Sequence, residues 1–194
     1  MSQEKLVKYL QQVLPMPNEK AIQIAETFKP KLMPKNTFLI EEGKVCSTSH
    51  FIEKGYARMY TFDTEGKDVT TALYSNGMFA NDFCSFFKRV PSLENLQALT
   101  DCETWYLSFE DLQKNFHTIP EFREFGRMLL INNHASLKQR MLSMIQQTGE
   151  QRYAHLMETH PDIFQNVPLK NIASYLGLTD TSLSRIRRDF ATKN

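Results

Sequence analysis

The sequence predicts an α+β fold in which an N-terminal jelly roll (double-stranded β-helix) with flanking helices is followed by a long helix and a C-terminal helix-turn-helix. Three observations support this prediction. Residues 31–107 hold many short aromatic and β-branched segments, residues 119–148 follow one helical pattern, and residues 169–190 contain two helical segments around a glycine. We therefore expect three parts, over residues 1–117, 118–148 and 149–194.

Length and composition are those of a globular protein. The chain has 194 residues, of which 41% are hydrophobic and 23% charged, which argues against a disordered or fibrous protein. The longest apolar run, residues 128–131, is far shorter than the ~20 residues needed to cross a bilayer. Glu4, Lys5 and Lys8 interrupt the apolar residues of the N-terminus, unlike a signal peptide. We expect a cytoplasmic protein that does not engage a membrane.

The jelly roll is predicted from strand-like segments separated by glycine turns. Two short helices come first, because apolar residues recur at helical spacing on both sides of Pro15 and Pro17. Many short strands at regular spacing are typical of antiparallel barrels and jelly rolls. The expected strands are residues 37–40, 49–53, 56–62, 69–74 and 104–107.

The long helical segment carries two apolar stripes, so it can serve two neighbours. One stripe is expected to pack on the jelly roll and the other on a second copy of the same helix, as in a coiled coil. The alternative is a single wide face buried within one chain. The first stripe is Phe122, Phe125, Leu129, Asn132 and Ser136, and the second is Leu130, Leu137, Met141 and Met144.

Residues 169–190 have the pattern of a helix-turn-helix. Pro168 suits the first turn of a helix, and Ile172, Ala173 and Leu176 form its core-facing stripe. Gly177 ends that helix, and the hydroxyl of Thr179 can cap the next one. The result is two helices joined by a tight turn that contains glycine.

The second of these helices has a face suited to DNA. With Leu183 and Ile186 turned inward, helical spacing turns Arg185 outward, where its guanidinium can pair with guanine in the major groove. Thr181 and Ser184 can meet a base edge or a phosphate, whereas Ser182, Arg187 and Arg188 are expected on the sugar–phosphate backbone. The alternative is a helical hairpin whose basic face is only solvated. The predicted DNA-binding residues are Lys170, Thr179, Asp180, Thr181, Ser182, Ser184, Arg185, Arg187 and Arg188.

The segment LKNIASYLGLTDTSLSRIRR, residues 169–188, resembles the helix-turn-helix of the CRP/FNR superfamily, bacterial regulators related to the catabolite activator protein. The order of parts along nearly the whole chain is similar too. The resemblance implies a cyclic-nucleotide-binding-like sensor domain, a dimerisation helix and a homodimer on a pseudo-palindromic operator of double-stranded DNA. Half-sites would lie ~34–36 Å apart. RNA polymerase is a further partner that the resemblance suggests.

The sequence departs from this family where nucleotide-binding members clamp the cyclic phosphate and ribose. Those members use a Gly-Glu-Leu turn and a later Arg-Ser pair. Here Asn81 and Asp82 replace the glycine and glutamate, Ser92-Leu93 replaces Arg-Ser, and Arg89 is the nearest guanidinium. We therefore expect that the sensor domain either binds an unidentified small-molecule effector other than cyclic AMP or has lost small-molecule control. The candidate effector residues are Gly77, Phe79, Asn81, Asp82, Phe83, Arg89, Ser92, Leu93, Leu137 and Lys138.

Other chemistry has little support in the sequence. Cys46, Cys84 and Cys102 are widely spaced and lack a Cys-x-x-Cys pair, so we expect reduced thiols and no metal site. No glycine-rich phosphate loop or nucleophile elbow is present, and we expect neither catalysis nor a required cofactor. The alternative function is a cyclic-nucleotide-binding signalling module that acts through protein partners.

Overall fold

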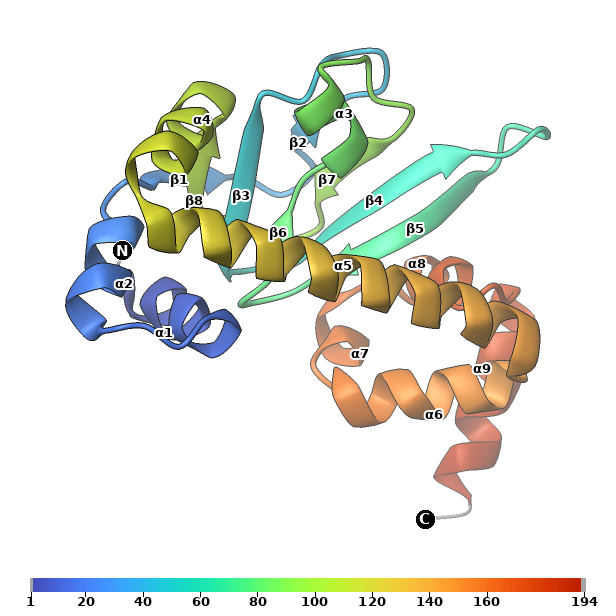
Figure 1. Ribbon diagram of the computed structural model, residues 1–194. Coiled ribbons are helices and arrows are strands. Elements are labelled where there is room, and N and C mark those ends of the chain that lie inside the picture. The colour runs from blue at the N-terminus through green and yellow to red at the C-terminus, as the bar shows by residue number, and fades with distance from the viewer. Residues whose placement is uncertain (1, 193–194) are drawn as a thin grey trace.

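The computed structural model describes residues 2–192 and divides into a jelly roll, a long helix and a group of C-terminal helices (Figure 1). Two helices, α1 (Glu4–Val13) and α2 (Asn18–Ala25), precede the strands. The strands are β1 (Lys29–Met33), β2 (Phe38–Ile40), β3 (Thr48–Lys54), β4 (Ala57–Phe62), β5 (Asp68–Tyr74), β6 (Phe79–Ala80), β7 (Asn95–Ala98) and β8 (Cys102–Ser108). The later helices are α3 (Phe83–Lys88), α4 (Phe109–Thr118), α5 (Pro120–Gln146), α6 (Gly149–Thr159), α7 (Ile163–Asn166), α8 (Leu169–Tyr175) and α9 (Asp180–Ala191).

The strands form two four-stranded antiparallel sheets. Their orders are β1-β8-β3-β6 and β2-β7-β4-β5, so neighbours in space are distant in sequence, as in a jelly roll. The predicted fold class is confirmed, and each of the five expected strands is present. The sequence did not predict β1, β6 or β7. These strands are short or polar, and β1 lies at a sheet edge, where Pro30 costs no ladder hydrogen bond.

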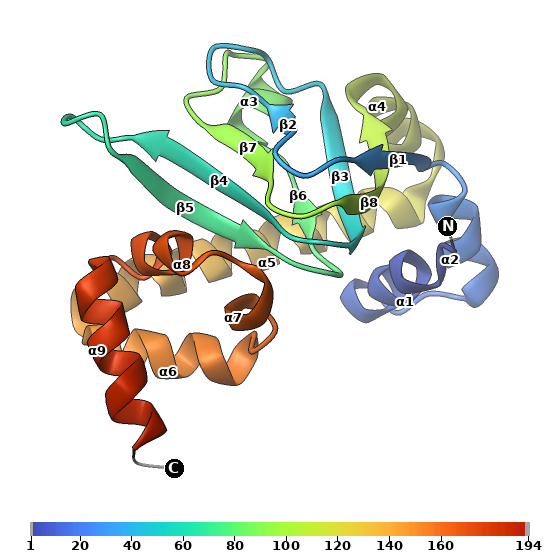
Figure 2. The same cartoon turned by 180° about the vertical axis from the view of Figure 1, so that it is seen from behind.

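The main core joins the jelly roll to the helices on its flank. Phe51, Phe86 and Leu96 are fully buried, and Leu6 and Leu10 of α1 pack into the same cluster. Figure 2 shows α1 and α2 beside the β1–β8–β3 sheet, at the end far from the C-terminal helices.

The long helix α5 connects the two ends of the molecule (Figure 1). In the first stripe, Phe122 and Phe125 are buried against the jelly roll as predicted, and Leu129 packs against the same core. The prediction is wrong for Asn132 and Ser136, which are exposed. The second stripe faces solvent, with Leu137 67% and Met141 47% exposed. The alternative of one wide face buried within a single chain is therefore wrong for this helix.

The C-terminal helices have a core of their own, to which Tyr153, Leu156, Ile172, Leu183 and Ile186 contribute. The first of these helices, α6, begins with a capping box between Thr148 and Gln151. Within residues 2–192, no helix has both the length and the hydrophobicity to span a membrane.

Candidate nucleic-acid interface and effector region

The connection between α8 and α9 is set by one glycine and one capping threonine. Gly177 has φ +65°, a left-handed conformation that favours glycine, and a Cβ added there would also displace the Met144 Cε, which lies 2.5 Å from that position. The hydroxyl of Thr179 accepts a hydrogen bond from the Ser182 backbone N–H at 3.2 Å and starts α9. Four residues thus separate the two helices.

The two faces of α9 differ sharply. Leu183 and Ile186 are buried against α8 and the C-terminal core. The opposite face is exposed and forms a shallow depression lined by Asp180, Thr181, Ser184, Arg185 and Arg188. The structure thus brings five of the nine predicted DNA-binding residues together on one surface.

The other four predicted DNA-binding residues border this surface or serve the fold. Arg187 and Lys170 are exposed. Thr179 and Ser182 are engaged with each other at the start of α9, because the Thr179 hydroxyl also donates to the Ser182 Oγ at 2.9 Å. These two residues therefore hold the beginning of the helix whatever else they contact.

The β4–β5 hairpin holds α8 through a buried arginine. The Arg58 guanidinium donates to the Asn171 Oδ1 at 3.1 Å and pairs with the Asp68 carboxylate at 2.8 Å. A hydrogen bond from Arg58, followed by its positive charge, holds the pKa of Asp68 below its usual range. The Thr70 backbone N–H also donates to the Ser174 Oγ at 2.8 Å. Helix α8 is thus tied along the edge of the jelly roll.

A second tie between the same parts uses Tyr56. Its hydroxyl donates to the Asp162 Oδ2 at 2.8 Å and accepts from the Asn166 Nδ2 at 3.1 Å. Burial, followed by the hydrogen bond to Asp162, raises the pKa of Tyr56 to about 12. Tyr56 directly precedes β4 of the jelly roll, and its ring packs into the core of the C-terminal helices. The residue therefore joins the two parts.

Helices α5 and α6 reach the end of α8 directly. The Arg140 guanidinium donates to the Tyr175 carbonyl at 2.9 Å and stacks 3.8 Å from the centre of its ring. Arg152 donates to the Leu176 carbonyl at 2.9 Å. A displacement of α5 would therefore be felt at the turn before α9.

The candidate effector residues do not form one pocket. Phe79, Asn81 and Phe83 line a common cavity beside α5. The other members of the set lie elsewhere: Gly77 lines the neighbouring hollow next to α1, Leu93 is 78% exposed, and Leu137 and Lys138 face solvent on α5.

The polar members of that set are used within the chain. The Asp82 carboxylate caps α3 by accepting from the Ser85 N–H at 3.0 Å. The Arg89 guanidinium donates to the Cys46 carbonyl at 2.6 Å and lies over the Phe109 ring. The Ser92 hydroxyl donates to the Glu94 carbonyl at 2.8 Å. None of these contacts leaves a guanidinium directed at a bound phosphate.

Tyr74 packs against the jelly-roll core, at a place that sequence reasoning missed. Its hydroxyl donates to the Met59 sulfur at 3.9 Å. Burial, followed by the negative charges of Glu94 and Asp82, raises the pKa of Tyr74 well above its usual range. An aromatic ring and two carboxylates therefore occupy this neighbourhood, which disfavours an anionic ligand there.

Within the described residues, no group of three His, Cys, Asp or Glu side chains is arranged to hold a metal ion. Cys46 and Cys102 are buried thiols, and Cys84 is an exposed one on α3.

Comparison with protein families identifies the jelly roll. The cyclic nucleotide-binding domain family matches residues 30–118, from β1 to the end of α4. A search of curated protein sequences finds no match.

Solved structures extend the similarity to the C-terminal helices. The c-di-GMP-responsive global regulator CLP of Xanthomonas campestris is 14% identical with a TM-score of 0.69, over 91% of this chain and 93% of its own. FixK2 of Bradyrhizobium japonicum is 16% identical with a TM-score of 0.71, over 86% and 85%. The catabolite activator protein of Thermus thermophilus is 18% identical with a TM-score of 0.58, over 95% and 87%. The chain has the fold of the CRP/FNR regulators.

Within the CRP/FNR fold, the residues that sequence reasoning overlooked are those that join its parts. Arg58 and Tyr56 stand in a strand pattern and carry no local motif, so their partners in α7 and α8 were not foreseeable. An arginine at the second position of a strand whose first four residues are buried is the signal that could have drawn attention to this contact.

Proposed function

We propose that the chain is a homodimeric, DNA-binding transcription regulator of the CRP/FNR type. The observation that carries this proposal is the exposed face of α9, where Arg185 and Arg188 stand beside Thr181 and Ser184. A helix with an apolar face on its domain and a row of hydroxyl and guanidinium groups outside is suited to the major groove.

The roles of the exposed residues follow from their chemistry. Arg185 lies in the second turn of α9, where its planar guanidinium can pair with the two acceptors of a guanine edge. Thr181 and Ser184 supply hydroxyls to bases or phosphates. Arg187 and Arg188 supply charge to the backbone, and Lys170 adds charge from α8.

The proposed dimer uses the exposed stripe of α5. Leu130, His134, Leu137, Met141 and Met144 alternate at spacings of four and three residues, the a/d repeat of a coiled coil, and all five are exposed. Pairing two such helices would bury this stripe and place two copies of α9 on successive grooves of a pseudo-palindromic operator. At the promoter, the DNA-bound dimer would contact RNA polymerase.

Effector control in this proposal does not run through cyclic AMP. Ser92 and Leu93 provide no guanidinium, and the Ser92 hydroxyl already bonds within its own loop. An effector would act by favouring one arrangement of α5, since a ligand shifts an equilibrium only by its differential affinity for the two states. No cofactor is required for this role.

The test is DNA binding by two matched arginine variants. An operator is first selected from a randomised DNA pool, and affinities for it and for random DNA are measured over a range of salt concentrations. Arg185→Ala should lose ~1–3 kcal/mol on the operator and relax its sequence preference. Arg187→Ala should weaken both DNAs similarly and flatten the salt dependence.

Two results would count against the proposal. If both variants lose equal affinity for the operator and for random DNA, Arg185 does not read a base. Tight binding of cyclic AMP together with weak, salt-insensitive DNA binding would favour a signalling module that acts on proteins.

A further inference from the structure

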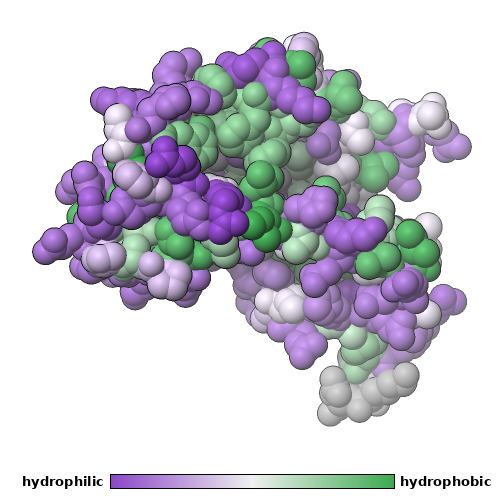
Figure 3. All heavy atoms as spheres, in the orientation of Figure 1, coloured by the Kyte–Doolittle hydropathy of each residue, from purple (hydrophilic) through white to green (hydrophobic). Residues whose placement is uncertain are grey.

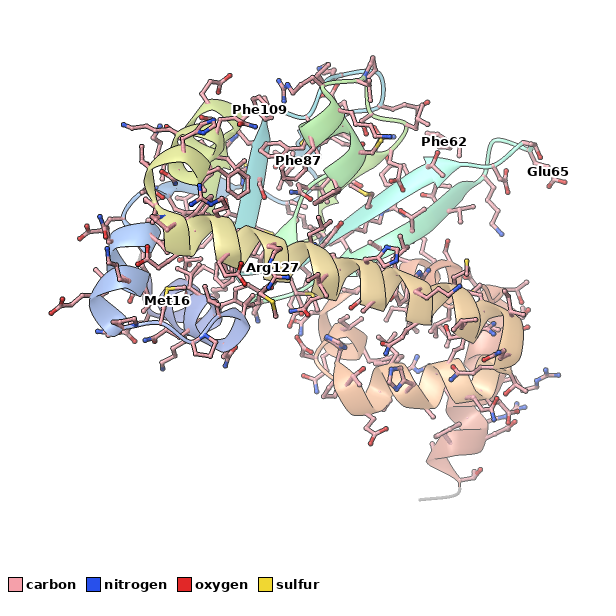
Figure 4. All side chains as sticks on the ribbon, viewed as in Figure 1. Met16, Phe62, Glu65, Phe87, Phe109 and Arg127 are labelled. Carbon is pink, nitrogen blue, oxygen red and sulfur yellow. The ribbon has the colours of Figure 1, made fainter. Side chains whose placement is uncertain are left out.

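A large apolar cavity lies between the jelly roll and the first half of α5. Its volume is about 590 Å³, within the ~300–1,000 Å³ typical of small-molecule sites. Figure 3 shows the corresponding hollow, with apolar residues gathered around it between α3, α4 and α5. Figure 4 labels Phe87 of α3 and Arg127 of α5, which line it from the two sides.

Phenylalanine is the commonest residue in the lining, with seven of the seventeen residues. Phe79 comes from β6, Phe83 and Phe87 from α3, and Phe122 and Phe125 from α5. The Phe83 and Phe87 rings pack against each other, with 4.5 Å between their centroids. The two side chains nevertheless remain 41% and 37% exposed. Burying such rings against an apolar molecule is favourable, because it removes apolar surface from water.

One buried polar group faces this lining. The Ser49 side chain accepts a hydrogen bond from the Asn81 Nδ2 at 3.0 Å, and Ser49 is only 6% exposed. Among the described residues, no hydrogen bond donated by the Ser49 hydroxyl is found. Buried hydroxyls nearly always find an acceptor, so this donor suits an oxygen that arrives with a ligand.

One of the two guanidinium groups at the rim is already neutralised by a carboxylate. The Arg127 guanidinium is paired with the Glu124 carboxylate through two contacts, at 2.6 and 2.8 Å. Arg123 is exposed to solvent and donates to the Phe116 carbonyl at 3.4 Å.

We propose that this cavity binds the effector, a small apolar molecule with one hydrogen-bond-accepting oxygen. The oxygen accepts from the Ser49 hydroxyl, and the apolar body lies among the phenylalanines of α3 and α5. Helix α5 forms one wall of the cavity, and its Arg140 contacts the end of α8, before the turn to α9. A ligand in the cavity that shifts α5 therefore also shifts the DNA-binding helices. The regulatory meaning of the site rests on the proposed function, whereas binding itself does not.

Binding is tested on the whole purified chain without DNA. The neutral fluorescent reporter N-phenyl-1-naphthylamine is bound first, and 2-undecanone, decanoate and cyclic AMP are then offered as competitors. We expect displacement by 2-undecanone, weaker displacement by decanoate and none by cyclic AMP. Ser49→Ala should weaken 2-undecanone about 5- to 10-fold, the worth of one hydrogen bond, and leave the reporter nearly unchanged.

A matched pair of phenylalanine variants locates the site. Phe87→Ser should weaken both reporter and ketone at least ~10-fold, because an apolar wall is lost. Phe62→Ser changes an exposed phenylalanine, 51% against 37% for Phe87, that does not line the cavity, and it should have no effect. Circular dichroism of each variant shows whether the fold is retained.

Three outcomes would overturn the proposal: no displacement by the ketone, equal effects of Phe87→Ser and Phe62→Ser, or a dimer in which the cavity takes up no reporter because a second copy fills it. The selected operator is measured on the same samples. If the natural chain binds no reporter but binds DNA normally, the cavity proposal is refuted and the proposed function stands.

Discussion

Replacing Tyr56 by phenylalanine tests the contact between the jelly roll and the C-terminal helices. The change keeps the buried ring and removes the hydroxyl that donates to Asp162 and accepts from Asn166. A hydrogen bond to a charged group contributes ~1.5–3 kcal/mol and a neutral one ~0.5–1.5 kcal/mol. Because Asp162 and Asn166 keep access to water, we expect the lower end of the sum, about 2 kcal/mol of unfolding free energy.

Urea unfolding of a double-mutant cycle measures this contribution. The cycle combines Tyr56→Phe with Asp162→Asn, and the coupling between the two changes should be ~1–2 kcal/mol. Tyr106→Phe is the matched control, because no hydrogen bond to its hydroxyl is found among the described residues and its ring stacks on His50. That control should change stability by less than ~0.5 kcal/mol.

Alkaline pH offers an independent check of the same contact. The pKa of Tyr56 is raised to about 12, from an ordinary value near 10, so its protonated form is the one that the fold stabilises. Its contribution is complete below pH ~10 and is lost as the pH rises toward 12. The gap between the natural chain and Tyr56→Phe should close over that range. Equal stability of the two proteins at pH 8, or a gap that persists at pH 12, would refute the role of this hydroxyl.

Three further changes have defined outcomes. Burial lowers the pKa of His50 to about 3, so between pH ~6.5 and 3 only the unfolded chain binds a proton at this residue. His50 should therefore reduce the unfolding free energy of the natural chain by ~1.4 kcal/mol for each pH unit below ~6.5. Acid titration of His50→Gln should show a shallower loss of stability, and equal slopes for the two proteins would contradict this role. Leu137→Glu should shift sedimentation from dimer to monomer, while Lys138→Glu next to it should not, and a dimer that survives Leu137→Glu would exclude this stripe as the interface. Thr148→Ala removes the capping box of α6 and should lower the melting temperature by the equivalent of ~1 kcal/mol; an unchanged value would show that the cap is not needed.

Several features of this protein could be derived from short stretches of sequence. Strand-like segments between glycines predicted β2, β3, β4, β5 and β8, and helical periodicity predicted α5 and the burial of Phe122 and Phe125. Gly177 and Thr179 marked the end of α8 and the start of α9, because turn conformation and capping are properties of a few adjacent residues. The outward face of α9 followed from helical spacing alone.

The tertiary structure decided what the distant residues do. The candidate effector residues looked like one site because they surround the Gly-Glu-Leu and Arg-Ser positions of related regulators. In three dimensions Asp82 caps a helix, Arg89 binds a carbonyl and Leu93 faces solvent. The buried Ser49 became a candidate ligand group only because β3 and β6 pair and bring it to Asn81.

The sequence by itself determined the order of parts, the class of fold and the chemistry displayed on α9, because each depends on periodicity or on neighbours along the chain. Only the tertiary structure decided where a ligand has room and how the parts are held together. Arg58 and Asn171 are 113 positions apart, and Tyr56 and Asp162 are 106 apart. Such contacts arise from the packing of whole elements, and no local pattern records which buried polar group will meet which partner.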